Sequence, residues 1–197
     1  MKTLLVVMTL SVFGFAQSLS ESVPNYQSIT GKERAKWFVN TTAGPVSLLL
    51  AGPASAAWGT AFNSPKEYGP HWEGFGKRYG MRLTGVSVGN AIEGGLGAIW
   101  GEDPRYFRSP EAGFKKRVKY VVIASFLAPN RDGQWRLAYA RYAGNIGNNY
   151  LSNLWRVPSE ATAGQATLRC VYGMLGELGG NAFAEFWPDI RKKVFHK

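Results

Sequence analysis

The strongest limit on the fold of this chain is a stretch of 22 residues, positions 42–63, that contains no ionisable side chain. Alanine, glycine and serine alternate there with large apolar residues, among them Leu48, Trp58 and Phe62. Because small residues let neighbouring helices approach closely, the stretch predicts a tightly packed helix. Pro53 should kink or split this helix, since proline lacks a backbone N–H donor.

The other long apolar segments all contain charged residues. Arg82 and Glu93 interrupt one segment, and Arg169, Glu177 and Glu185 interrupt another. Each charge near the centre of a bilayer costs roughly 2.5–3.5 kcal/mol on insertion scales, so a peripheral or soluble bundle is favoured over a set of spanning helices. We therefore predict an all-α fold, a single-domain helical bundle of about five helices joined by glycine- and aromatic-rich loops.

Local signals divide this bundle into helices. Thr30 and Glu33 have the spacing of a capping box, which predicts a helix beginning near residue 31. Residues 114–127 are predicted to form a helix, and an extended segment is the alternative because several of the side chains are β-branched. The remaining expectations are a loop at 63–76, a turn at 129–133, and helices at 78–100, 135–155 and 161–186, the last ended by Trp187-Pro188-Asp189.

The first residues predict export from the cytoplasm. Lys2 precedes an apolar run at 4–15, and the small residue Ala16 follows it, as in a signal peptide. We expect a signal peptide at 1–16, a tether at 17–29 and one helical domain at 30–197. The run is too short to span a bilayer, and no cysteine near the cleavage site permits lipid attachment. The expected location is the periplasm or outer envelope, with peripheral membrane association as an option.

Charge indicates the class of partner. The chain has a formal net charge of +10, which favours an anionic membrane surface or an anionic envelope polymer. Nucleic acid is not expected, because an exported protein does not meet it, and the sequence is compatible with a homo-oligomer. The densest basic clusters, at 115–119 and 191–193, are interpreted as solvated helix ends. Cys170 is the only cysteine, so no intramolecular disulfide can form.

One weak catalytic candidate combines His71 with the carboxylates of Glu102 and Asp103. These residue types serve as acids, bases and metal ligands, so they support an alternative function as a hydrolase or transferase acting on envelope lipid or glycan. Their spacing fits no metal signature, and we expect neither a metal nor a cofactor. Turn and capping roles are favoured for the two carboxylates.

Polar stripes in the apolar helices form the second candidate site. Asparagine and glutamate residues recur every four positions, so they share one helical face. Such groups must be hydrogen-bonded when buried, and pairing between helices is the favoured interpretation. A polar pocket in which Glu93 or Glu177 has a raised pKa is the alternative. The stripe residues are Asn145, Asn149 and Asn153, and then Glu177, Asn181 and Glu185.

Three motifs carry a resemblance to a known family. They are EGFGKRYG at 73–80, EDPRYFR at 102–108 and EFWPDI at 185–190. In these motifs the chain resembles a family of exported acidobacterial proteins to which no activity is assigned, so the resemblance implies export but no reaction. It directs attention to Arg105, Tyr106 and Arg108, which either clamp an anion or pin the turn to the bundle, with pinning favoured. The predicted function is that of a non-enzymatic envelope protein.

Overall fold

A computed structural model describes residues 22–195, so the expected signal peptide at 1–16 lies outside the described residues. Helices make up 71% of the structure, and the predicted all-α class is confirmed. Contacts divide the chain into two compact units. Unit 1 takes in the chain up to Ile29, Gly101–Ala138 and Met174–Lys197, and unit 2 takes in Thr30–Trp100 and Tyr139–Gly173. The single helical domain at 30–197 stays a prediction.

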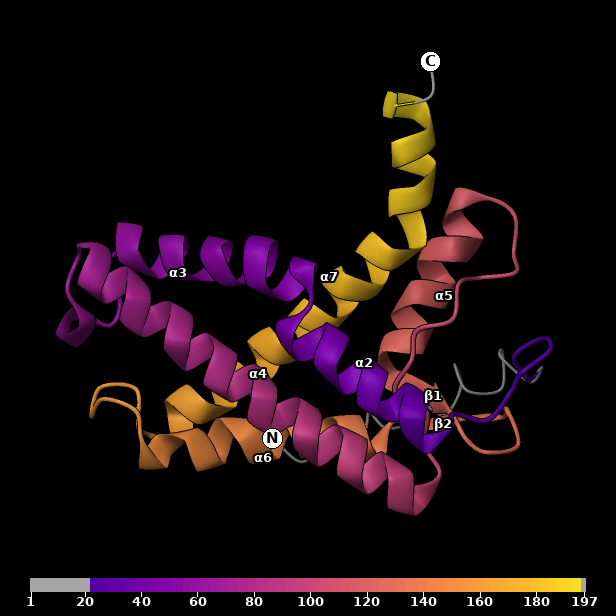
Figure 1. Cartoon of the computed structure of the whole chain (residues 1–197), viewed down its shortest axis with the longest axis horizontal. Helices are drawn as coiled ribbons and strands as arrows, with labels where there is room; N and C mark the ends of the chain where they lie inside the picture. Colours follow the sequence, from indigo (N-terminus) through magenta and orange to yellow (C-terminus); the bar gives the residue numbers. More distant parts are fainter. Residues whose placement is uncertain (1–21, 196–197) are drawn as a thin grey trace, which may run out of the picture. The chain divides into compact units, whose positions relative to one another are not determined.

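Figure 1 shows the helices and the small hairpin of the two units. The C-terminal helix α7 contributes its first part to unit 2 and its second part to unit 1. Unit 2 otherwise contains α2 (Gly31–Ala43), η2 (Val46–Ala51), α3 (Gly52–Ala61), η3 (Lys66–Tyr68), α4 (Trp72–Trp100), α6 (Tyr139–Leu151) and η4 (Ser152–Leu154). Unit 1 otherwise contains α5 (Phe114–Phe126), β1 (Leu127–Pro129) and β2 (Trp135–Leu137), and α7 runs over Ala163–Phe195.

The predicted start of α2 is correct. The Thr30 side chain accepts a hydrogen bond from the Glu33 N–H, and the Glu33 carboxylate accepts one from the Thr30 N–H at 2.8 Å. This reciprocal pair satisfies two of the backbone donors that a helix start leaves without partners, which is why the helix begins there.

The uncharged stretch is divided between the π-helix η2 and the α-helix α3. Pro53 is the second residue of α3, and because η2 runs directly into α3 its missing N–H leaves the Leu48 carbonyl without the donor that Gly52 supplies to Ser47. The Tyr79 hydroxyl donates to the Leu48 carbonyl instead, at 3.0 Å.

Gly52 lies directly against the Tyr79 ring of α4, so close that a Cβ there would come within 2.6 Å of it. Gly52 and Gly59 therefore face α4, as the sequence suggested for helix packing, whereas Ala54, Ser55 and Ala57 are exposed.

Helix α4 begins at Trp72, six residues before the expected start at 78. The glycines of 72–77 were interpreted as loop residues, and this was wrong because at least one of them serves packing. A Cβ at Gly74 would meet the carbonyl groups of Tyr68 and Gly69, so only glycine fits at this turn of the helix. The close approach offsets the low helix propensity of glycine.

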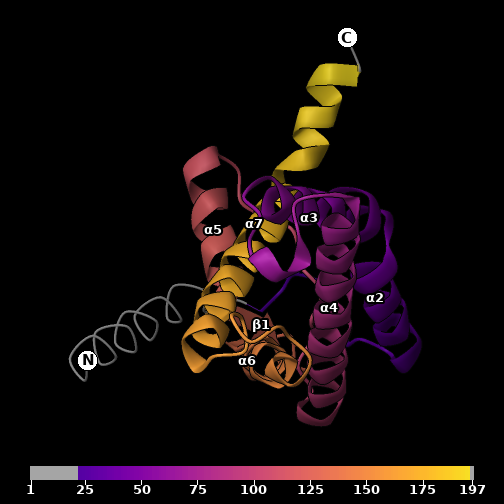
Figure 2. The ribbon, with the colours of Figure 1, turned by 90° about the vertical axis from the view of Figure 1, so that its left-hand side faces the viewer.

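Helix α4 is the centre of unit 2 and packs against α2, α3 and α6. Its contact with α6 is closest at Gly89 and Gly144, where a Cβ on Gly144 would lie 2.7 Å from the Gly89 carbonyl oxygen. Figures 1 and 2 both show α6 away from α3, and the two helices contact α4 at different points along its length. Glycines thus set the spacing of the helices in unit 2.

Unit 1 contains a hairpin that the sequence analysis missed. Strands β1 and β2 pair antiparallel with Leu127 opposite Leu137 and Pro129 opposite Trp135. The predicted turn at 129–133 is correct and includes Gly133 at φ +76°, a value that favours glycine. The helix expected over 135–155 consequently starts at Tyr139 and ends at Leu151, because residues 135–137 pair with β1.

The expected helix end at Pro188 is wrong, because α7 continues to Phe195. A proline inside a helix disturbs the bonds of the preceding turn. In α7 the Glu185 carbonyl of that turn accepts hydrogen bonds from Arg117 Nη2 at 2.7 Å and Arg108 Nη2 at 3.0 Å. Pro188 leaves the Ala184 carbonyl without its helical N–H donor, and the two arginines bind the neighbouring carbonyl of Glu185 in the same turn.

Candidate functional site

A buried carboxylate organises the polar interior of unit 1. The Glu185 side chain is fully buried on α7, and Oε1 accepts a hydrogen bond from Arg117 Nε at 2.6 Å. Oε2 accepts from the Tyr106 hydroxyl at 2.9 Å and from the Ser109 N–H at 3.0 Å. Burial alone would raise the pKa of Glu185, but these hydrogen bonds hold it below its ordinary value. The carboxylate is thus kept ionised in a fixed structural role.

Arg117 joins α5 to α7 through a second carboxylate. Its Nη1 lies 2.6 Å from Oδ2 of Asp189, and its guanidinium stacks over the Phe186 ring at 4.7 Å from the centroid. Hydrogen bonds from Arg117 hold the pKa of Asp189 below its usual range. Figures 1 and 2 show α5 beside the C-terminal half of α7, as this set of bonds requires.

The hydroxyl groups near Glu185 stay protonated. Burial and the hydrogen bond to Glu185 raise the pKa of Tyr106, and burial raises the pKa of Tyr120 to about 12. The Tyr106 and Tyr120 rings meet edge to face at 6.4 Å between centroids. At neutral pH both tyrosines are therefore protonated: Tyr106 donates a hydrogen bond to Glu185, and Tyr120 packs against the Tyr106 ring.

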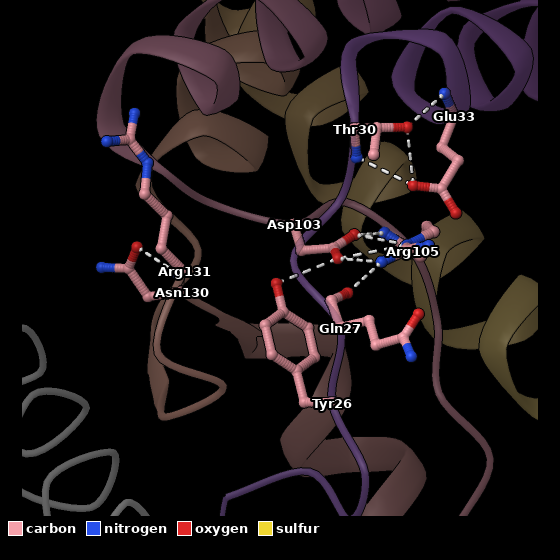
Figure 3. A network of polar contacts seen from close by, with 8 residues as sticks. All are labelled: Tyr26, Gln27, Thr30, Glu33, Asp103, Arg105, Asn130 and Arg131. Atoms are coloured by element: carbon pink, nitrogen blue, oxygen red, sulfur yellow. Dashed lines mark hydrogen bonds and ion pairs between the residues drawn. The ribbon is translucent and has the colours of Figure 1, made fainter.

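A second buried carboxylate, Asp103, holds the turn that precedes Arg105 (Figure 3). The Asp103 side chain is fully buried and accepts a hydrogen bond from the Tyr26 hydroxyl at 3.1 Å. It also accepts from Arg105 Nη2 at 2.8 Å, while the same nitrogen donates to the Gln27 carbonyl at 2.9 Å. Burial, followed by the charge of Asp103, raises the pKa of Tyr26 to about 12. Residues 22–29, expected as a tether, thus contribute contacts to unit 1.

The three residues singled out by the family resemblance all bind within unit 1. Arg105 pairs with Asp103, Tyr106 donates to Glu185, and Arg108 donates to the Glu185 carbonyl. The motif at 102–108 therefore meets the motif at 185–190. In this geometry the three residues have a structural role, because their bonds fix the segment 102–108 within unit 1 and attach it to α7.

The weak catalytic candidates fall in different units. His71 is exposed in unit 2, immediately before α4, whereas Glu102 and Asp103 are buried in unit 1. Both oxygens of Asp103 accept hydrogen bonds from Tyr26 or Arg105, so the carboxylate is held in a structural network. The hydrolase or transferase alternative stays a prediction.

The asparagine stripe of α6 bonds to α7 within unit 2. Asn145 Nδ2 donates to the Cys170 carbonyl at 2.8 Å, and Asn149 Nδ2 donates to Asn145 Oδ1 at 2.9 Å. Asn153 Oδ1 accepts from Arg169 Nη2 at 2.6 Å. The bonds of Asn145 and Asn153 connect α6 and the adjoining η4 to α7, as the favoured interpretation of the stripe requires, whereas the bond between Asn149 and Asn145 lies within α6.

The stripe of α7 belongs to unit 1 and bonds to α5. Asn181 Nδ2 lies 3.0 Å from the Ser125 hydroxyl oxygen and 3.3 Å from Glu177 Oε1. Glu93, the other residue considered for a polar pocket, pairs in unit 2 with Arg141 at 3.3 Å. The stripes therefore serve separate helix contacts within their own units.

Arg78 is a buried polar residue that the sequence analysis missed. Its guanidinium donates to the carbonyl groups of Ser64 at 2.9 Å, Gly69 at 2.7 Å and Pro65 at 2.8 Å. The side chain is 7% exposed and lies over the Tyr68 ring. One arginine thus fixes the loop between α3 and α4, and the only sequence signal was a glycine- and proline-rich loop next to a charged helix start.

The outer face of η2 and α3 carries large apolar side chains, which we call the apolar stripe. Leu49 is 77% exposed, Trp58 is 71% exposed and Phe62 is 65% exposed. The Trp58 and Phe62 rings contact each other at 4.7 Å between centroids. The stripe consists of Val46, Leu49, Leu50, Trp58 and Phe62, and the exposed Ala54 fills the eight-residue interval between Leu50 and Trp58.

The inner face of the same segment is small or polar. Ser47 and Ala56 are buried, and Gly59 lies against the aliphatic part of Arg78. This is the reverse of an ordinary amphipathic helix in a water-soluble domain, where large apolar residues face inward. The spacing was visible in the sequence, but only packing on α4 decides which face points outward.

Metal-ligating side chains do not gather at one place in the described residues. Within residues 22–195, no group of three or more histidine, cysteine, aspartate or glutamate side chains could hold a metal ion. A hollow of about 350 Å³ between α2 and α4 is lined chiefly by glycine, alanine and Phe38. The Asn90 amide in it donates to the hydroxyl groups of Thr41 and Thr42.

Across the part of the chain that the structure describes, no helix is long and apolar enough to cross a membrane. Comparison with protein families, curated proteins and solved structures gives no match. Function must therefore be argued from the surfaces and contacts of the chain itself.

Proposed function

We propose that the protein is an exported, non-enzymatic component of the bacterial envelope that docks on a membrane surface through the apolar stripe of unit 2. The single observation that carries the proposal is the exposed row of large apolar side chains on a helical segment without any ionisable residue between positions 42 and 63. Isolated exposed apolar residues are ordinary, but a continuous row marks an interaction surface.

The dimensions of the stripe suit a helix lying in the plane of the interface. Residues 46–62 extend over roughly 25 Å at 1.5 Å per residue, and one face is apolar along this length. Interfacial helices bury their apolar face about 5–10 Å deep at the boundary of headgroups and acyl chains. Large side chains that could insert to this depth lie at both ends of the stripe: Leu49 and Leu50 at one end, and Trp58 and Phe62 at the other.

Charge and packing favour lipid over a protein partner as the occupant. Protein interfaces have a polar rim and about one hydrogen bond per 100–200 Å², whereas this segment lacks charged groups. The formal net charge of +10 attracts the chain to anionic membranes. Helices held together by glycine and polar residues, with large apolar groups outside, resemble the packing of helices surrounded by lipid.

The test is binding of the processed protein, purified from the envelope of expressing cells, to vesicles of zwitterionic phosphatidylcholine. Gln in place of Leu49 and Trp58 should weaken binding about 100-fold, since each inserted side chain contributes about 1.5 kcal/mol or more. Leu154→Gln is the matched control, because Leu154 is 82% exposed on η4, outside the stripe, and its replacement should leave binding unchanged. Absence of binding by the unaltered protein, or equal loss in the control, contradicts the proposal.

A further inference from the structure

The two basic clusters of the sequence, 76 positions apart from Lys115 to Arg191, come together at one end of unit 1. The first turns of α5 carry one cluster, and the last turns of α7 carry the other. Arg117 bridges them through Asp189 at 2.6 Å, and the Phe114 and Phe186 rings meet at 5.4 Å between centroids. We call the exposed cations there the basic end: Lys115, Lys116, Lys119, Arg191, Lys192 and Lys193.

We infer that the basic end is a second membrane contact, which selects anionic lipid headgroups; this inference rests on the proposed function of membrane docking. Residues 108–119 and 185–193 together contain eight basic and three acidic residues. Half of the formal net charge of +10 is therefore concentrated in these two short segments. A concentration of this size attracts the negative surface of an anionic membrane.

The acidic residues of this region already have cationic partners. Glu185 and Asp189 bind Arg117, and Glu111 pairs with Lys116 at 3.0 Å. Among the described residues, no ion pair is formed by Lys115, Lys119, Arg191 or Lys193, and all four are exposed. Their charges are thus available to an external anion.

Exposed apolar groups accompany these cations and favour lipid over a soluble polymer. Phe114 is exposed in the first turn of α5, and Trp187 stacks on Phe183 at 5.1 Å between ring centroids. Along α7 the exposed residues Phe183, Trp187, Ile190 and Val194 follow at intervals of three or four, so they share one face. Basic residues beside a row of aromatic and aliphatic groups are characteristic of helices that bind anionic membranes.

The experiment compares binding of the processed, envelope-purified protein to vesicles of phosphatidylcholine alone and of phosphatidylcholine with 30% phosphatidylglycerol. The unaltered protein should bind the anionic vesicles more tightly, and added salt should remove the difference. Combined Lys115→Gln and Lys119→Gln should weaken anionic binding about 25-fold, at about fivefold per charge near the surface. Combined Arg191→Gln and Lys193→Gln should have a similar effect.

Charge-matched controls separate this site from a general effect of net charge. Lys32→Gln with Lys36→Gln removes the same charge from exposed positions on α2 in unit 2, and should change binding by less than about twofold. Equal binding of the unaltered protein to both vesicle types overturns the inference but leaves the proposed function standing. Equal loss in the α2 control also overturns it, whereas failure to bind either vesicle overturns the proposed function itself.

Discussion

Replacing Arg117 with methionine should destabilise unit 1 by about 3–5 kcal/mol. The Arg117 side chain is 18% exposed and the Glu185 side chain 1% exposed, so their ion pair is largely removed from water. Removing one partner of such a pair leaves a buried charge without compensation, which accounts for the size of the effect. Local opening around Ser109, whose N–H binds Glu185, should increase roughly 100- to 5000-fold.

The same variant should weaken the dependence of stability on acid. In the unaltered protein the pKa of Glu185 is held below its ordinary value, so its stabilising contribution is complete above that value. This contribution is lost as the pH falls through the lowered pKa. Without Arg117, the hydrogen bonds from Ser109 and Tyr106 remain but the ion pair is lost, so the pKa of Glu185 should rise and acidification should cost the variant less stability than it costs the unaltered protein.

Two measurements check this prediction: urea denaturation at several pH values, and hydrogen exchange of the segment that contains Ser109. Arg108→Met is the matched control, because Arg108 is 48% exposed and contributes one bond to the Glu185 carbonyl. It should cost about 1 kcal/mol or less. The reasoning is refuted if both variants are equally destabilised, or if the Arg117 variant loses stability on acidification in parallel with the unaltered protein.

Four further substitutions test the packing of unit 2 by thermal denaturation. Gly144→Ala should reduce stability by about 1–3 kcal/mol, because the added Cβ would press on the Gly89 carbonyl. Gly80→Ala should stabilise α4 by up to about 1 kcal/mol, because Gly80 has open space around it. Equal effects of the two substitutions would contradict the close contact at Gly144. Arg78→Met should cost about 3 kcal/mol or more, since three carbonyl groups lose their donor, and a negligible change would show that the loop does not depend on it. Thr30→Ala removes the cap of α2 and should cost about 1 kcal/mol, with an unchanged melting temperature counting against the cap.

Features that depend on local chemistry were predictable from the sequence. Thr30 and Glu33 predict the start of α2, because both residues of a capping box lie within a four-residue segment. The all-α class followed from the long apolar segments and their spacing. These signals depend only on residues that are close together in the sequence, so the sequence alone is sufficient to predict them.

Features that depend on distant partners were not predictable. In the turn before Pro188, the Glu185 carbonyl accepts hydrogen bonds from Arg117 and Arg108, which lie about 70 residues earlier in the chain. The family motifs drew attention to Tyr106, but its partner Glu185 is 79 positions away. The outward direction of Trp58 depends on how α3 packs against α4, which no local pattern specifies.

The central claim, insertion of the apolar stripe into a membrane surface, is tested most directly by an environment-sensitive fluorophore on the stripe. The label would be attached at Leu49→Cys, with the natural cysteine removed as Cys170→Ala, and at Leu154→Cys as the control position. On addition of phosphatidylcholine vesicles, emission from position 49 should increase and shift to the blue, while emission from position 154 stays unchanged. Unchanged emission at position 49, or equal changes at both positions, would contradict docking through the stripe.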